Sequence, residues 1–181
     1  MKKTLLAVVA AVSFGVQAAD FVSVDVDHVT DSKTKQVSTA EYVRAGKEIG
    51  GIQLGLQSRT ARYNDGSGMF NSLELTAGKN FNGFTPYVGW GYDNGKNGLP
   101  SNQYNYGIVG AQYGTKAGPG FALAGVKTRV GSTESARTKQ TVTFASYSVP
   151  VAKDTSINLG VSRSDQDIKE RGVSIGVSFG F

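Results

Sequence analysis

The sequence contains no cysteine and only one histidine, His28. Without cysteine there are no disulfide bonds and no thiolate metal centres, so backbone pairing and packing must hold the fold together. A single histidine beside Asp27 is the one candidate general base, and no serine motif accompanies it. The acidic stretch 164–170 lacks the glycine and the spacing of a calcium-binding EF-hand loop. We therefore expect no enzyme activity, no metal and no cofactor.

Clustered positive charge and long apolar runs are also missing. The formal net charge is +5, and the lysines and arginines are scattered, which argues against nucleic-acid binding. After residue 18 there is no run of about 18 apolar residues, so we expect no transmembrane helix. Within residues 1–18, two lysines precede the apolar stretch Leu5–Val16 and a small residue at Ala18, which is the order of a signal peptide. We predict cleavage after Ala18, export through the periplasm, and one domain over residues 19–181.

Glycine and a two-residue alternation are abundant. The 24 glycines are nearly twice the usual share of about 7 %, which suits curved and closely packed strands. Beyond the leader we find no helical period, and apolar residues instead recur at every second position. The alternation predicts ten strands, at residues 21–30, 37–46, 51–63, 69–79, 84–92, 103–114, 121–131, 140–149, 155–163 and 172–181.

The connections between these strands alternate in character. Short turns at 47–50, 80–83, 115–120 and 150–154 alternate with polar loops at 31–36, 64–68, 93–102, 132–139 and 164–170. An even number of antiparallel strands, with short turns on one rim and longer loops on the other, is typical of bacterial outer-membrane barrels. We predict an all-β fold, a closed antiparallel up-and-down transmembrane β-barrel. Ten strands are favoured, and eight remain open if segment 37–46 or 140–149 is misassigned.

The two faces of such a barrel have to be assigned. Apolar rows from ten strands would overfill the interior or enclose a ligand cavity, as in a soluble periplasmic ligand-binding barrel, which is the rival interpretation. The opposite assignment places the apolar rows against lipid and the polar rows inside. Aromatic residues at the strand ends support it, because membrane interfaces favour them. Two belts are predicted. The belt at the outer rim comprises Tyr63, Phe70, Tyr92, Tyr104 and Tyr106. The belt at the periplasmic rim comprises Phe21, Phe81, Phe84, Tyr113, Phe121, Tyr147, Phe179 and Phe181.

Charged residues of both signs fall on the rows that we assign to the lumen. Burying a charge costs several kcal/mol unless it is paired, so these residues should form a nearly complete network. We predict a salt-bridged, largely plugged interior with at most a narrow passage, and a small water-filled pore is the alternative. The predicted network comprises Asp25, Asp27, Glu41, Arg59, Glu74, Lys127 and Arg129.

The last ten residues, GVSIGVSFGF, alternate strictly. Their apolar positions resemble the assembly signal of Gram-negative outer-membrane barrels, a terminal phenylalanine preceded by apolar residues at every second position. With the leader, the chain resembles small barrels of the OmpA/OmpX and opacity type, although these usually have eight strands. The resemblance implies periplasmic chaperones, insertion by the barrel-assembly machinery, and location in the outer membrane. The residues concerned are Val173, Ile175, Val177, Phe179 and Phe181.

These observations favour a structural or narrow passive-pore role. A surface adhesion or recognition protein acting on host or phage through its loops is the first alternative, and a lipid-modifying enzyme is the second. Cations in or beside the outer loops would suit the phosphates of lipopolysaccharide. They are Lys33, Lys35, Lys96, Arg137, Lys139, Lys169 and Arg171.

Overall fold

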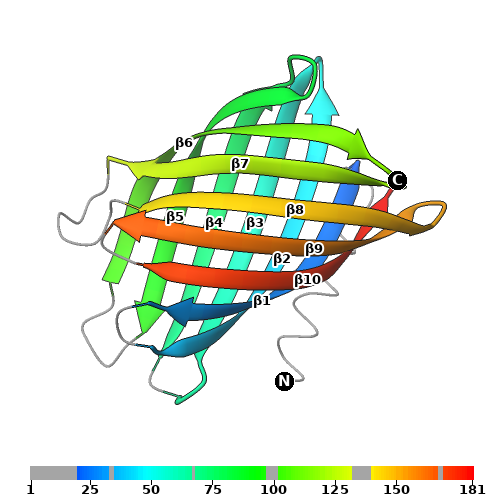
Figure 1. Cartoon of the computed structure of the whole chain (residues 1–181). Coiled ribbons are helices and arrows are strands. Elements are labelled where there is room, and N and C mark those ends of the chain that lie inside the picture. Colours follow the sequence, from blue (N-terminus) through cyan, green and yellow to red (C-terminus); the bar gives the residue numbers. More distant parts are fainter. Residues whose placement is uncertain (1–19, 33–34, 67, 97–101, 132–139, 167–168) are drawn as a thin grey trace.

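The computed structural model describes residues 20–32, 35–66, 68–96, 102–131, 140–166 and 169–181. These residues form ten antiparallel strands in a closed barrel, in which each strand pairs with its neighbour in sequence and β1 pairs with β10 (Figure 1). The strands are β1 (Phe21–Asp31), β2 (Val37–Ile49), β3 (Ile52–Tyr63), β4 (Met69–Lys79), β5 (Phe84–Lys96), β6 (Asn102–Ala117), β7 (Gly120–Val130), β8 (Gln140–Ala152), β9 (Thr155–Gln166) and β10 (Glu170–Gly180). The predicted fold class and the count of ten strands are confirmed.

Some predicted features fall outside this description. The predicted signal peptide, residues 1–18, and the loop cations Lys33, Arg137 and Lys139 lie outside the described residues. Within the described part of the chain, no helix is long and apolar enough to cross a membrane.

The two rims of the barrel differ in the length of their connections. On the rim that carries the start of β1 and the end of β10, neighbouring strands are joined by two to four residues, whereas the other rim has connections of three to nine. The turn between β2 and β3 is Gly50-Gly51, with φ of 59° and 78°, which is the left-handed pair that a two-residue hairpin requires. Short turns are typical of the periplasmic rim and longer loops of the extracellular rim, and we name the rims accordingly.

Several strands extend further toward the outer rim than the apolar pattern predicted. Residues 93–96 were expected in a loop, but they continue β5, where Asp93 pairs with Tyr104 and Asn94 with Gln103. The prediction was wrong here because it treated Asp, Asn and Gly as loop residues, although polar and small residues also occupy the inward face of a paired strand, as Asp93 does. The backbone ladder continues for as long as a partner strand lies opposite.

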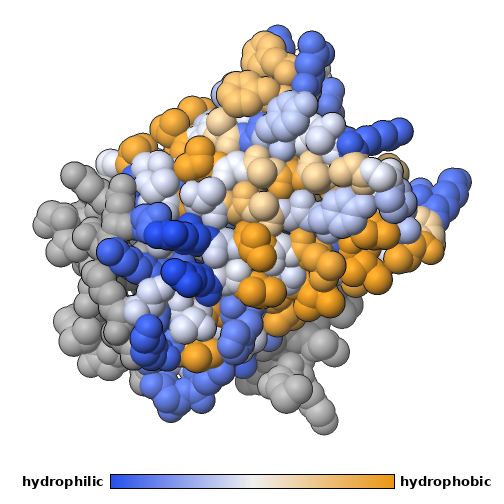
Figure 2. Space-filling view, in the orientation of Figure 1, coloured by the Kyte–Doolittle hydropathy of each residue, from blue (hydrophilic) through white to orange (hydrophobic). Residues whose placement is uncertain are grey.

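The outer wall of the barrel is apolar. Leu159 and Ile175 are directly opposite each other on β9 and β10, and their side chains are 50 % and 60 % exposed. Leu54 on β3 is also exposed, and Figure 2 shows apolar residues spread over the visible wall. A monomeric protein in water rarely exposes a large contiguous apolar surface, whereas lipid-facing barrels require one. The rival soluble barrel is contradicted, because its apolar rows would point inward.

The predicted outer belt of aromatic residues is wrong. Only Tyr92 of that group lies on an outward row, opposite Leu73. Tyr104 and Tyr106 are buried in the lumen, and Tyr63 and Phe70 lie on inward rows, where their rings meet edge to face at 5.8 Å. Proximity to a rim did not decide the direction of these rings, because strand parity assigns each residue to one face. The outward aromatic residues nearer the periplasmic rim are Phe84, Tyr113, Tyr147 and Phe179.

Candidate functional site: the lumen network

Polar side chains from the inward rows meet in the middle of the barrel. The register brings Gln57 on β3, Glu74 on β4, Gly91 on β5 and Tyr106 on β6 directly opposite one another in turn. Directly opposite residues in an antiparallel pair share a face, so these four positions form one row across four strands. Glu74 and Tyr106 are both buried, which shows that this row faces the lumen.

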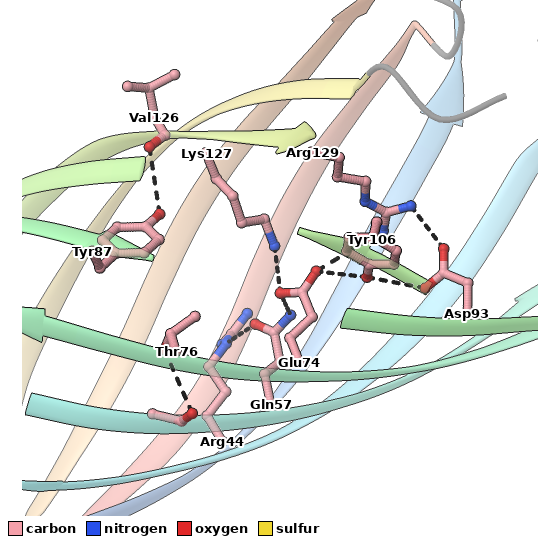
Figure 3. A network of polar contacts seen from close by, with 11 residues as sticks. Arg44, Gln57, Glu74, Thr76, Tyr87, Asp93, Tyr106, Val126, Lys127 and Arg129 are labelled. Atoms are coloured by element: carbon pink, nitrogen blue, oxygen red, sulfur yellow. Dashed lines mark hydrogen bonds and ion pairs between the residues drawn. The ribbon is translucent and has the colours of Figure 1, made fainter. Parts of the chain in front are cut away.

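Glu74 is the centre of the network. Its Oε2 accepts hydrogen bonds from Lys127 Nζ at 2.6 Å and Gln57 Nε2 at 3.1 Å. Its Oε1 accepts from the Tyr106 hydroxyl at 3.0 Å and lies 3.9 Å from Arg129 Nη2. Lys127 and Arg129 come from β7, which is separated from β4 by two strands in the wall, so these contacts cross the lumen (Figure 3).

A second carboxylate, Asp93, shares partners with Glu74. It accepts hydrogen bonds from Arg129 Nη1 at 2.7 Å, from the Tyr104 hydroxyl at 2.8 Å and from the Tyr106 hydroxyl at 3.1 Å. Tyr106 has one hydroxyl hydrogen and therefore donates to either Glu74 or Asp93 at any moment. The Arg129 guanidinium stacks over the Tyr106 ring, 4.1 Å from its centroid. Its positive charge lies between the Glu74 and Asp93 carboxylates and compensates their negative charge.

The network continues from Glu74 to the opposite side of the barrel. Arg44 on β2 donates to Gln57 Oε1 at 2.8 Å, so the Gln57 amide links the Arg44 guanidinium to the Glu74 carboxylate. Arg44 also forms an ion pair with Asp25 on β1. Asn158 on β9 donates to Asp25 at 3.4 Å and accepts from two serine hydroxyls. Those serines are Ser148 on β8 and Ser178 on β10. Side chains from all ten strands thus belong to one connected hydrogen-bond network.

Two glycines leave room for this network. A Cβ atom at Gly91 would overlap the Tyr106 ring, and one at Gly176 would overlap the Asp25 carboxylate. Both side chains therefore lie flat against a neighbouring strand, which only glycine permits at those positions. Part of the high glycine content of the chain serves this close approach.

The structure brings together four of the seven residues that the sequence placed in the lumen network. Asp25, Glu74, Lys127 and Arg129 are joined as described above. Asp27 and Arg59 occupy inward rows, but among the described residues neither forms an ion pair, and Asp27 Oδ1 and Arg59 Nε have no hydrogen-bond partner. Arg59 instead lies near the Tyr42 ring, 5.7 Å from its centroid.

Glu41 is a correction, because it faces outward rather than into the lumen. It lies opposite Val26 on β1 and Thr60 on β3, both on outward rows. The sequence of β2 is ambiguous, since both faces carry charged residues, Glu41 and Lys47 on one and Arg44 and Glu48 on the other. The register with β1 selects Arg44 for the lumen, opposite buried Ser23.

Sequence reasoning missed eight of the network members described above, and four of them, Arg44, Ser148, Asn158 and Ser178, were not among the residues predicted for it. Asp93 was assigned to a loop, Tyr104 and Tyr106 were assigned to the membrane interface, and Gln57 was not singled out. The signal for Asp93 was present, because it continues the parity of Tyr87, Gly89 and Gly91.

His28 lies on the outward face of β1, opposite Thr39 and Val173. Within the described part of the chain there is no group of three or more His, Cys, Asp or Glu residues that could hold a metal ion. The predicted assembly-signal residues Val173, Ile175, Val177, Phe179 and Phe181 are exposed on the outer side. Their recognition by an assembly machine stays a prediction.

Comparisons with known proteins identify the fold. No protein-family model matches the chain, and no curated protein matches it. Among solved structures, the chain is similar to the beta domain of the Bordetella autotransporter BrkA, with a TM-score of 0.56 and 12 % identity over 90 % of this chain and 99 % of that one. It is also similar to the translocator domain of the autotransporter NalP from Neisseria meningitidis, with a TM-score of 0.50 and 13 % identity over 99 % and 96 % of the two chains.

At this identity the likeness shows the fold alone. The chain is a small outer-membrane-type β-barrel with transmembrane strands. The apolar outer wall and this fold together support a location in the outer membrane.

Proposed function

We propose that the chain is an outer-membrane barrel with a structural role, or at most a narrow passive pore, because the side-chain network closes its lumen. The observation that carries the proposal is the contact between Lys127 and Glu74 across the lumen, within a network drawn from all ten strands. A solute or hydrated ion would have to break these hydrogen bonds to pass. Breaking them leaves buried charges without partners, which costs several kcal/mol per ion.

Burial favours the plugged interior over the water-filled alternative. Glu74, Asp93 and Arg129 are 4 %, 7 % and 7 % exposed, although they are the charged groups at the centre of the lumen. A pore wide enough for a continuous water column would expose these side chains. Charges of both signs are balanced locally, with Glu74 and Asp93 facing Lys127 and Arg129.

Planar-bilayer recordings of the full chain test the proposal. The unmodified protein is expected to show no steady pore on the nanosiemens scale. The double variant Glu74→Ala/Lys127→Ala removes the contact across the lumen, and we expect a larger conductance from it. A matched control, Glu48→Ala/Lys153→Ala, removes one exposed charge of each sign at the periplasmic rim and should leave the current unchanged. A steady nanosiemens current through the unmodified barrel would refute the plugged lumen.

Two further roles stay predictions. Adhesion to host or phage would act through the outer loops, large parts of which lie outside the described residues. Loop substitution followed by a cell-binding assay tests it. Insertion by the barrel-assembly machinery, with periplasmic chaperones, rests on the resemblance of the last strand.

A further inference from the structure

Two arginines face each other on the outer wall. Arg163 on β9 and Arg171 on β10 are direct partners in the antiparallel ladder, and both are exposed. Directly opposite residues on one face have Cβ atoms about 4.5–5.5 Å apart, and like charges there destabilise the sheet. The pair therefore suits a site where an anion lies between the two guanidinium groups.

The position of this arginine pair along the strands indicates which part of a lipid it would meet. Val161 on β9 and Val173 on β10 each lie two positions closer to the periplasmic rim than the arginine of their strand. They are also direct partners, and both are exposed. Two residues of a strand span about 7 Å, so the outward surface changes from apolar to cationic within that distance. Figure 2 shows hydrophilic residues gathered at the outer ends of β9 and β10, beside the apolar wall. The arginines thus lie where acyl chains end and lipid headgroups begin.

The positive charge is only partly compensated by the protein. Arg163 donates to Asp165 Oδ1 from Nε at 3.3 Å and from Nη2 at 3.1 Å. Among the described residues Arg171 forms no ion pair, so the three side chains together keep one positive charge. The described outward positions of β6, β7 and β8 near this rim are uncharged, and they include Asn105, Thr128 and Thr141. The part of the outer wall formed by β6, β7 and β8 therefore carries no charge at its described positions near this rim.

We propose that Arg163 and Arg171 bind a phosphate group of an outer-leaflet glycolipid whose acyl chains cover Val161 and Val173. Arginine presents a planar fork of donors that matches phosphate oxygens, and a phosphate shared by two guanidinium groups removes their mutual repulsion. An amphiphile with a phosphate group next to its acyl chains fits both the arginine pair and the valine pair of this surface. This inference goes beyond the proposed function and does not depend on the state of the lumen.

Native mass spectrometry of the full chain in detergent, titrated with diphosphorylated lipid A, tests the proposal. The double variant Arg163→Gln/Arg171→Gln should bind roughly tenfold or more weakly, because it loses charge-assisted hydrogen bonds. The control Lys79→Gln/Lys153→Gln removes two exposed cations at the periplasmic rim and should bind as the unmodified protein does. Heat-modifiable gel mobility verifies that each variant is folded.

Three further measurements make the test decisive. Dephosphorylated lipid A should bind weakly, and free inorganic phosphate should not displace diphosphorylated lipid A. Asp165→Asn frees Arg163 and should tighten binding, which keeps the proposal testable even if the double variant fails to fold. Equal binding by the unmodified protein and the double variant, or by the two forms of lipid A, would overturn the proposal. Displacement by inorganic phosphate would overturn the assignment to a lipid, and unchanged or weaker binding by Asp165→Asn would overturn the role of the arginines.

Discussion

Replacing Glu74 by glutamine changes the charge at the centre of the lumen while nearly preserving the side-chain volume. In the unmodified protein the two carboxylates Glu74 and Asp93 balance Lys127 and Arg129. Glu74→Gln removes the partner that lies 2.6 Å from Lys127 Nζ and leaves one uncompensated positive charge. The glutamine amide also brings two N–H donors to a place where Lys127, Gln57 and Tyr106 already donate.

The expected loss in the free energy of unfolding follows from these contacts. Removing one partner of a buried ion pair typically costs about 3–5 kcal/mol. The Lys127 side chain is partly accessible, so we expect the lower end, about 3 kcal/mol. Replacing both charges by groups of similar volume is often neutral, and Glu74→Gln/Lys127→Met should therefore recover most of the loss.

Equilibrium denaturant unfolding of the barrel in lipid vesicles measures these changes through the fluorescence of the single tryptophan, Trp90, on the outward face of β5. The control Glu48→Gln alters an exposed carboxylate at the periplasmic rim and should stay within about 0.5 kcal/mol of the unmodified protein. If Glu74→Gln is equally well tolerated, water solvates the lumen charges and the reasoning that led to a plugged interior is refuted.

Two other substitutions test the wall and the packing inside it. Leu159→Lys on the lipid-facing wall should destabilise the barrel in vesicles by about 2–4 kcal/mol, whereas Val151→Lys beside a periplasmic turn should cost about 0–1 kcal/mol; equal costs would contradict the outward apolar face. Gly91→Ala should displace the Tyr106 ring, lower the denaturant midpoint of unfolding and raise the bilayer conductance. In the control Gly180→Ala the added methyl group meets only ordinary contacts, so the midpoint and the conductance should both stay unchanged. An unaltered midpoint for Gly91→Ala would show that the ring does not need this glycine.

Much of the barrel was predictable because strand parity is a local property. Alternation favoured ten strands and placed Leu54, Leu159 and Ile175 on one apolar face. That face was assigned to the outer wall because apolar rows from ten strands would overfill the interior. The lumen was predictable where one face is clearly polar, as for Asp25 and Glu74. The prediction of the lumen failed at β2, where both faces carry charged residues, and at Asp93, where composition suggested a loop.

The amino-acid sequence by itself determined that the chain forms strands with one apolar and one polar face, the polar face carrying charges of both signs, since a two-residue period shows in any short segment. It favoured ten strands with the apolar face outward, and the structure confirmed both. Only the tertiary structure decided which of those charges meet. Glu74 and Lys127 are 53 residues apart and lie on strands separated by two others, so closure of the barrel, rather than any neighbouring sequence, places them 2.6 Å apart. Register likewise chose Arg44 over Glu41, because pairing with β1 sets the face of every residue in β2 at once.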